Sequence, residues 1–434
     1  MAAVYFHNRL AASATFELFI RNLPANRGYL VAAGLEQALE YLETVAFSSE
    51  QIDFLRRHPA FKHISSQFFD FLHGLRFTGE VWAVAEGTPI FAQEPLLRVT
   101  APIVEGQIVE TFLLSSISFQ TLIATKAARV VQSAAGRQVV EFGSRRAHGP
   151  EAGILAARAA YIGGCAGSSN VEAHYRYGIP SFGTLAHSFV MTYEDEGQSF
   201  QDFSRLFPEH AVLLLDTYDT LAALDRMIAL GIRPPGVRLD SGDFVALSKE
   251  VRRRLDRAGL TETKIVVSGD MDEAAIKQLL AAGAPIDIFG VGTALATSQD
   301  APALSGVYKL VEFDGQPRVK LSQEKASYPC RKQVFRSARN NTYTGDMIGL
   351  AEEASEGEPL LNCVKRDGKR LQPALPLDQI REHAAQALKS VPAEVRALER
   401  PAHYPVRLSR RLEEVWEMLR SNREDLALSK AENR

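Results

Sequence analysis

Short apolar runs recur along the middle of the chain, between residues 139 and 311, and each ends in glycine or in a polar or reactive side chain. Stretches rich in alanine and leucine, with helical spacing, separate many of them. This alternation is typical of parallel βα units, whose strands are buried on both faces. A series of such units favours a barrel, in which functional residues gather at the carboxyl ends of the strands. The runs begin at Val139, Ser181, Val212, Gly236, Lys264, Ile286 and Gly306.

The pattern before residue 110 is different. Residues 14–20 alternate and predict a strand, whereas residues 29–42 and 67–77 have the apolar spacing of amphipathic helices. Between residues 79 and 102, short apolar runs around a Gly-Thr-Pro turn predict antiparallel strands. A helix of about two dozen residues should then lead into the strand at Val139.

After residue 311 the repetition stops. Turn-rich residues 312–375 predict a small β-rich piece, and two helices should follow near residues 377–390 and 408–421. We therefore expect an N-terminal α/β domain at residues 1–110, a barrel at residues 111–311 and a C-terminal region at residues 312–434.

Composition narrows the classes of function. The 434 residues are 46% hydrophobic and 23% charged, as in an ordinary soluble globular protein, and the net charge of −3 offers no broad surface for nucleic acid. Three scattered cysteines suit neither a disulfide framework nor a metal knuckle. Because we find no signal peptide and no run long enough to span a bilayer, we expect a cytoplasmic protein.

Three basic side chains, Arg145, Arg146 and His148, precede Pro150, a residue well placed to begin a helix. Positive charge at a helix N-terminus opposes the helix dipole unless an anion binds there. The cluster predicts an anion site, and the alternative is a solvated basic loop.

In the run at Gly236, strand alternation puts Arg238 and Asp240 on one face. A guanidinium in a barrel mouth suits capture of a carboxylate or a phosphate, and Asp240 and Asp243 suit sugar hydroxyls or a phosphate-bound magnesium ion. An internal Arg–Asp salt bridge without a ligand explains the motif equally well. Asp216, which follows a fully apolar run, is a further candidate.

Two glycine-containing turns, Ser268-Gly269-Asp270 and Gly290-Val-Gly292-Thr293, follow later runs. Small residues with free backbone N–H groups at helix starts form phosphate cradles, although glycine turns are common everywhere. Beside the basic cluster they predict a ligand with more than one phosphate. Lys309, in the last run, leaves open a Schiff-base enzyme, which has less need of phosphate-directed loops.

The segment Ser181-Phe-Gly-Thr-Leu-Ala-His-Ser188 reads as a buried strand that opens into hydroxyl and imidazole groups. A histidine in such a place is more often structural than catalytic. Repetition of the same design along the chain makes His187 a candidate for catalysis.

Several motifs resemble those of the nicotinate phosphoribosyltransferase family and keep the family's order along the chain. The resemblance extends from about Phe16 to the C-terminal helices. The resemblance implies an α/β type II phosphoribosyltransferase fold, with an incomplete TIM-like barrel packed against an α/β N-terminal domain and a small C-terminal appendage. It also implies a homodimer with active sites near the subunit interface. The motifs are Glu141-Phe-Gly-Ser-Arg-Arg-Ala-His148, Gly183-Thr-Leu-Ala-His-Ser188, Leu215-Asp-Thr-Tyr-Asp219, Gly236-Val-Arg-Leu-Asp-Ser-Gly-Asp243, Gly290-Val-Gly-Thr293 and Gly306-Val-Tyr-Lys-Leu-Val311.

The resemblance further implies transfer of a phosphoribosyl group from 5-phosphoribosyl 1-diphosphate to nicotinate, coupled to ATP hydrolysis, with Mg²⁺ as cofactor. His187 is the residue expected to be phosphorylated transiently, and Asp216 and Asp240 are the other expected catalytic residues. Thr184 and Arg238 are expected to contact nicotinate. The remaining expected substrate-binding residues are Arg145, Ser268, Gly269, Gly290, Gly292 and Thr293, and no metal ligand is assigned.

The family's usual N-terminal Thr-Asp-Leu-Tyr-type segment, whose tyrosine is expected to stack on nicotinate, has no counterpart after Met1. Either the true start lies upstream of Met1 or a substrate contact is missing. Tyr5 aligns poorly with it and takes no role. The alternative function is therefore a chain that binds phosphoribosyl ligands but turns over weakly. Among bases, the Gly-Thr-Leu-Ala-His motif argues against quinolinate and separates nicotinamide less cleanly.

Overall fold

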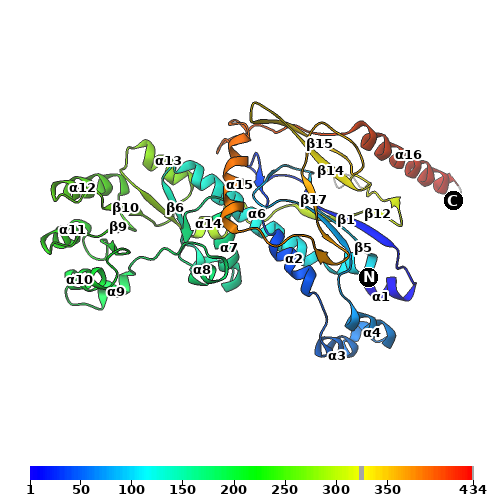
Figure 1. Ribbon diagram of the computed structural model, residues 1–434, viewed down its shortest axis with the longest axis horizontal. Helices are drawn as coiled ribbons and strands as arrows, with labels where there is room; N and C mark the ends of the chain where they lie inside the picture. The colour runs from blue at the N-terminus through cyan, green and yellow to red at the C-terminus, as the bar shows by residue number, and fades with distance from the viewer. Residues whose placement is uncertain (322–326, 433–434) are drawn as a thin grey trace. The chain divides into compact units, whose positions relative to one another are not determined.

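The computed structural model describes residues 1–321 and 327–432, which divide into two compact units (Figure 1). Unit 1 comprises Met1–Thr121, Ala303–Pro376 and Gln386–Arg434, and unit 2 comprises Leu122–Pro302 and Leu377–Ala385. Residues expected to form a separate C-terminal region therefore share a unit with the N-terminal residues. Two long helices, α6 (Glu110–Ser133) and α15 (Leu377–Ser390), contribute residues to both units.

Unit 2 is built on a six-stranded sheet in which every neighbouring pair is parallel, in the order β7-β6-β11-β10-β9-β8. The strands are short and mostly buried, which explains their continuous apolar runs in the sequence. This curled, open sheet with its helices confirms the predicted α/β class and the incomplete barrel. Its strands are β6 (Gln138–Glu141), β7 (Gly167–Ser168), β8 (Val212–Leu214), β9 (Gly236–Leu239), β10 (Lys264–Val267) and β11 (Ile288–Val291).

Helices follow the strands of unit 2, and Figure 1 shows α10 to α13 around β9 and β10. Four aspartates fix helix starts, since their side chains accept hydrogen bonds from first-turn N–H groups: Asp195 caps α10, Asp219 caps α11, Asp243 caps α12 and Asp272 caps α13. The helices are α7 (Pro150–Ile162), α8 (Val171–Tyr177), α9 (His187–Met191), α10 (Glu196–Leu206), α11 (Thr220–Ala229), α12 (Phe244–Arg257), α13 (Glu273–Ala281) and α14 (Thr293–Ala296).

Two of the apolar runs are not barrel strands. Residues 181–186 form a loop, joined to the sheet by a single bridge between Ser181 and Ser168, before α9 begins at His187. The last run, β12 (Gly306–Phe313), pairs antiparallel with β1 (Ser13–Ile20) in unit 1. The predictions of a strand at 181–188 and of a barrel strand carrying Lys309 were therefore wrong, because periodicity does not reveal which sheet a strand joins.

Unit 1 contains a seven-stranded sheet in the order β13-β12-β1-β5-β3-β17-β18, whose central strands pair antiparallel. A four-stranded sheet in the order β16-β14-β15-β19 and the pair β2-β4 complete it. The strands are β2 (Leu30–Val31), β3 (Glu80–Val84), β4 (Pro89–Ile90), β5 (Pro95–Pro102), β13 (Gln316–Pro317), β14 (Lys332–Arg339), β15 (Thr342–Leu350), β16 (Glu358–Pro359), β17 (Leu361–Arg366), β18 (Lys369–Arg370) and β19 (Val406–Leu408).

The predicted helices of unit 1 are present, but the one expected from residue 29 begins later, and the helices at residues 2–7, 49–57 and 103–108 were not predicted. Residues 30–31 form β2, and the helix begins only at Leu35, after Gly34 with a φ of 97°. No helix among the described residues is long and apolar enough to cross a membrane. The helices are α1 (Ala2–His7), α2 (Leu35–Thr44), α3 (Ser49–Arg57), α4 (Ser66–Gly74), α5 (Ile103–Ile108) and α16 (Arg410–Glu432).

A buried ion pair stabilises the smaller sheet of unit 1. The Arg336 guanidinium on β14 donates to both carboxylate oxygens of Asp346 on β15, with a shortest distance of 2.6 Å, and Arg336 is 3% exposed. Glu94 lies 4.0 Å from the same guanidinium, but burial, chiefly, and the Asp346 charge raise the pKa of Glu94 well above its ordinary value. Asp346 is therefore the main counter-ion of Arg336.

Replacing Asp346 by alanine should lower the free energy of unfolding by about 3–5 kcal/mol, because it leaves a buried guanidinium without its partner. The matched change Glu414→Ala removes an exposed partner of Arg410 and should cost about 0.5 kcal/mol or less. Urea denaturation of both variants measures the difference. Equal losses would contradict the assignment.

Candidate active site

The predicted polar residues of unit 2 converge because their strands are parallel. Asp240 directly follows β9 and Ser268 directly follows β10, while Asp216 comes two residues after β8 and Thr293 two residues after β11. Glu141 is the last residue of β6. The carboxyl ends of parallel strands lie at one edge of a sheet, so these side chains share one region of unit 2.

A hydrogen-bonded network of Arg238, Asp240 and Ser268 occupies the centre of this region. The Arg238 guanidinium donates from Nη2 to Asp240 Oδ1 and from Nε to Ser268 Oγ, each at 2.7 Å. The Ser268 hydroxyl in turn donates to Asp240 Oδ1. Nη1 of Arg238 donates to the Leu185 carbonyl at 3.3 Å. Each group orients the next, so the guanidinium has one fixed position.

Asp240 is held in its charged form. Burial alone raises the pKa of its carboxyl, but the hydrogen bond from Ser268, the Arg238 guanidinium and the nearby His187 outweigh burial, and the pKa lies below its ordinary value. An ionised carboxylate therefore faces the site at neutral pH.

His187 is the first residue of α9, and its side chain is 42% exposed. Nε2 lies 3.7 Å from Asp240 Oδ2, and Nδ1 lies 3.2 Å from Thr217 Oγ1. A carboxylate thus faces one ring nitrogen and a hydroxyl the other, while the ring stays accessible. This arrangement suits a histidine that reacts, because both neighbours orient the ring.

Asp216 contacts the loop that follows β9, next to the network. Its Oδ2 accepts from Ser241 Oγ at 2.5 Å and from the Asp240 N–H at 3.3 Å. Its Oδ1 is buried and has no hydrogen-bond partner among the described residues. A buried carboxylate oxygen without a donor is costly unless a ligand or a cation satisfies it.

Thr184 lies in the loop before α9, and its hydroxyl donates to the Val212 carbonyl of β8 at 3.1 Å. The next residue, Leu185, supplies the carbonyl that accepts from Arg238. These two contacts attach the loop to strands β8 and β9. The loop thereby places His187 against Asp240.

The two glycine turns approach the same region: Ser268–Asp270 follows β10, and Gly290–Thr293 spans the end of β11 and the start of α14. Gly269 has a φ of 94°, and a Cβ there would lie 2.4 Å from the Asp240 carbonyl oxygen. A Cβ on Gly290 would lie 2.5 Å from the Phe142 ring. Gly292 precedes α14, which Thr293 begins. Both turns therefore need glycine to bring the backbone close to the network.

Two predicted groups make no hydrogen bond to the network among the described residues. Arg145 and Arg146 are exposed in a short 3-10 turn, Ser144–Arg146, before α7. Asp243 accepts the N–H groups of Val245 and Ala246 as the cap of α12. The magnesium or sugar role considered for Asp243 stays a prediction, because only its Oδ1 accepts the capping hydrogen bonds.

Some residues of the site were missed by the sequence analysis, although all of them adjoin its motifs. Thr217 contacts His187, Ser241 contacts Asp216, and the Phe142 ring lies 5.9 Å from the Arg238 guanidinium. Glu141 is buried, and its carboxylate accepts from Ser168 Oγ at 2.6 Å and from the Gly143 N–H. Their position next to strand ends was the available signal.

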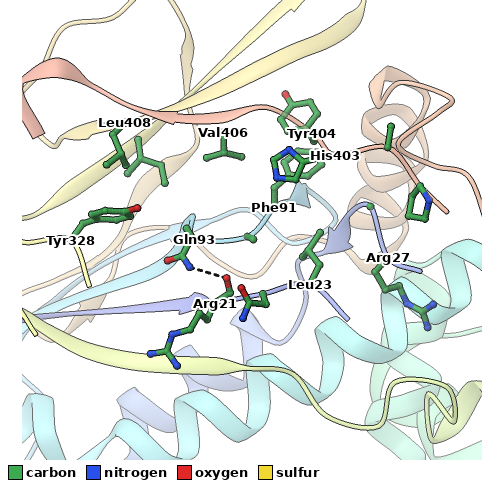
Figure 2. A pocket seen from close by; sticks show the side chains of 16 residues that line it. Arg21, Leu23, Arg27, Phe91, Gln93, Tyr328, His403, Tyr404, Val406 and Leu408 are labelled. Carbon is green, nitrogen blue, oxygen red and sulfur yellow. Dashed lines mark hydrogen bonds between the residues drawn. The ribbon is translucent and has the colours of Figure 1, made fainter. Parts of the chain in front are cut away.

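The described residues contain no group of three or more His, Cys, Asp or Glu side chains arranged to hold a metal ion. A cavity of about 500 Å³, shown in Figure 2, lies in unit 1. None of the predicted site residues lines it. There the Gln93 amide donates to the Arg21 carbonyl at 2.8 Å, and the arginine side chains extend away from His403 and Val406. The chemistry therefore points to the strand ends of unit 2 rather than to this cavity.

Comparison with family models covers most of the chain. The model described as the nicotinate phosphoribosyltransferase (NAPRTase) family matches residues 137–345. The models of the NAPRTase N-terminal domain and of the nicotinate phosphoribosyltransferase C-terminal domain match residues 1–118 and 354–416. All the site residues described above lie within the first match.

Individual relatives agree with the family models. Nicotinate phosphoribosyltransferase pncB2 of Mycobacterium tuberculosis is 47% identical, over 98% of this chain and 93% of its own length. Nicotinate phosphoribosyltransferase of Bacillus subtilis is 42% identical, over 81% of this chain and 74% of its own. The crystal structure of human nicotinic acid phosphoribosyltransferase superposes with a TM-score of 0.86 at 30% identity, covering 96% of this chain and 98% of that one.

The lowered pKa of Asp240 predicts a pH dependence of stability. A carboxyl whose pKa is lower in the folded than in the unfolded protein stabilises the fold above the unfolded value of about 3.9, and this contribution is lost as pH falls through the folded value. The difference in unfolding free energy between wild type and Asp240→Asn should therefore be largest near neutral pH and shrink below about pH 4. Urea denaturation from pH 7 to pH 3 tests this. A difference that grows on acidification would contradict it.

Proposed function

The chain belongs to the nicotinate phosphoribosyltransferase family, and on that premise we propose that it transfers the phosphoribosyl group of 5-phosphoribosyl 1-diphosphate to nicotinate. The products are nicotinate mononucleotide and diphosphate, and the reaction belongs to NAD biosynthesis. The observation that carries the proposal is the contact of His187 with an ionised Asp240 that Arg238 and Ser268 hold in place.

Arg238 is the proposed nicotinate carboxylate site. A guanidinium has five N–H groups, and Arg238 directs one each from Nε, Nη1 and Nη2 to Ser268, Leu185 and Asp240. One N–H on each terminal nitrogen is thus left, the pair that a carboxylate can accept bidentately. Thr184, in the loop beside Leu185, is the proposed second contact to nicotinate.

The nucleophile is the pyridine nitrogen, and it attacks the anomeric carbon of the sugar while the diphosphate leaves. The sugar becomes cation-like in this step, so carboxylates near the sugar stabilise it and positive charge stabilises the departing diphosphate. Asp240 and Asp216 are the proposed carboxylates, and the exposed Arg145 is the proposed contact to the anionic substrates. The backbone of Ser268–Gly269 and of Gly290–Thr293 is proposed to bind substrate phosphate.

Mg²⁺ is the proposed cofactor, and it would neutralise charge on the diphosphate. Asp216 and Asp240 would hold it, because hard cations prefer carboxylate oxygens and Asp216 Oδ1 is buried without a partner among the described residues. Together these two residues supply a small donor set, which suits an ion that arrives bound to substrate phosphates.

ATP coupling is proposed to run through His187. A ring nitrogen takes the γ-phosphoryl group, ADP leaves, and hydrolysis of the phosphohistidine returns the free imidazole. The exposure of the ring supports this role, and so do its neighbours Asp240 and Thr217, which orient it. We further propose a homodimer with active sites near the subunit interface.

The first experiment measures nicotinate mononucleotide formation from nicotinate and 5-phosphoribosyl 1-diphosphate, with and without ATP. ATP-stimulated product formation is the expected result. Binding of 5-phosphoribosyl 1-diphosphate without product would instead favour a chain that binds phosphoribosyl ligands.

Arg238→Met should raise the KM for nicotinate about 100-fold, because two charge-assisted hydrogen bonds are lost, each worth about 1.5 kcal/mol or more. Arg252→Met is the matched control, because Arg252 also lies in unit 2 and also donates to an aspartate and to backbone carbonyls. Its acceptors are the Asp256 carboxylate and the carbonyls of Leu260 and Thr263. The control should leave this KM unchanged. Steady-state kinetics with nicotinate as the varied substrate distinguishes the two.

His187→Ala should abolish stimulation by ATP while the fold is retained, because no ring nitrogen remains to accept the phosphoryl group. His210→Ala, at an exposed turn of the same unit, should behave as wild type. The ratio of product formed with and without ATP is the measurement. Equal ATP stimulation in His187→Ala and wild type would remove His187 from the coupling.

A further inference from the structure

A buried lysine of unit 2 lies on helix α6. Lys126 is 2% exposed, and its Nζ donates to the Glu273 carboxylate and, at 2.9 Å, to Asp300 Oδ1. Arg129, one turn later on α6, donates from Nε to the other Glu273 oxygen at 3.3 Å. One ammonium group thus joins two carboxylates that are 27 residues apart in the chain.

Glu273 fixes the end of the turn that follows β10. It is the first residue of α13, and it comes directly after the helix cap Asp272. Only Ser268–Met271 separate β10 from that cap, and two consecutive residues there, Gly269 and Asp270, have positive φ angles of 94° and 44°. A turn this short, in such a restricted backbone conformation, moves with the first turn of α13.

Asp300 is linked in the same way to the glycine turn at Gly290–Thr293. Thr293 begins α14, which ends at Ala296, and Ser298 then has a φ of 44°. The Ala301 N–H donates to the Ser298 carbonyl at 2.7 Å, so Asp300 lies within a tight turn at the end of the short helix. A displacement of Asp300 is therefore transmitted through α14 to the Gly290–Thr293 backbone.

We infer that Lys126 is a positioning residue that holds the two glycine turns at a fixed separation, so that both contact one phosphoribosyl ligand. The inference rests on the proposed function, because the phosphoribosyl substrate defines what the two turns bind. The ammonium group is buried among protein atoms on α6 and acts through Glu273 and Asp300 rather than by touching the substrate.

The physical argument is one of geometry rather than stability. Burying an ion pair often contributes little net free energy, because desolvation offsets the attraction. Such a pair nevertheless restricts its partners to one arrangement, since any other leaves a buried charge unsatisfied. Two turns that contact the same ligand need this restriction, because displacement of binding groups by about 1 Å can cost about 100-fold in rate.

The test compares Lys126→Met and Asp300→Asn with a matched control. Asp300→Asn weakens only the ion pair that links Lys126 to the turn at Gly290–Thr293. Because Asp300 is 45% exposed, this variant should fold even if Lys126→Met does not. Lys332→Met is the control, because Lys332 is 4% exposed and pairs with the buried Glu17 at 2.7 Å, in unit 1. Thermal unfolding of each variant reports the structural effect separately.

The measurements are the Kd of 5-phosphoribosyl 1-diphosphate by titration calorimetry and the KM of each substrate. Lys126→Met should weaken binding of 5-phosphoribosyl 1-diphosphate about tenfold, and Asp300→Asn should do so by a smaller factor, with the KM for nicotinate unchanged within about twofold. Lys332→Met should lower thermal stability without changing the ratio of the two KM values.

Two outcomes overturn the inference. One is a folded Asp300→Asn or Lys126→Met variant with the wild-type Kd for 5-phosphoribosyl 1-diphosphate. The other is an equal loss of affinity in Lys332→Met, which would mean that any destabilised variant behaves alike. A wild-type chain that binds 5-phosphoribosyl 1-diphosphate but forms no product counts against the proposed reaction alone, because the calorimetric comparison needs no turnover.

Discussion

The site of unit 2 depends on one interaction, the hydrogen-bonded ion pair between Arg238 and Asp240. Both residues come from one strand end, so the pair forms wherever β9 is placed, and Ser268 joins it only because β10 lies beside β9 in the sheet. Together with Ser268, the pair lowers the pKa of the Asp240 carboxyl opposite His187, and it leaves part of the guanidinium for a ligand. Without the carboxylate, the guanidinium would lose the partner that orients it.

The aspartates that follow the strands divide into two kinds. Asp219, Asp243 and Asp272 cap the first turns of helices with their side chains, which determines where those helices begin. Asp216 and Asp240 come closer to their strand ends and keep carboxylate oxygens that no helix uses. A difference of a few residues in position therefore decides whether an aspartate caps a helix.

Unit 1 shows how a sheet can join distant parts of the chain. β12 pairs with β1 and β17 pairs with β3, although each pair is separated by about 280 residues or more. The buried Arg336–Asp346 pair belongs to the neighbouring four-stranded sheet of the same unit. Unit 2 is thus largely a continuous segment inserted between the parts of unit 1.

The family and the incomplete form of the barrel came from the resemblance of the motifs. The parallel βα series, a barrel and the polar residues at the strand ends could be predicted from the pattern of residues. Local signals suffice for these features, because apolar runs, helix caps and glycine turns act over a few residues. The resemblance of the motifs then named His187, Arg238 and Asp240 before any contact was known.

The tertiary structure alone decided which sheet each strand joins and which polar groups meet. Lys309 follows the barrel pattern but lies in an antiparallel strand of unit 1, and the loop at residues 181–186 only resembles a strand. The contact of Lys126 with Glu273 and Asp300 had no local signal, because its members come from three separate elements. Hydrogen-bond pairing and burial between distant segments are set by the whole fold, and no short stretch of sequence contains that information.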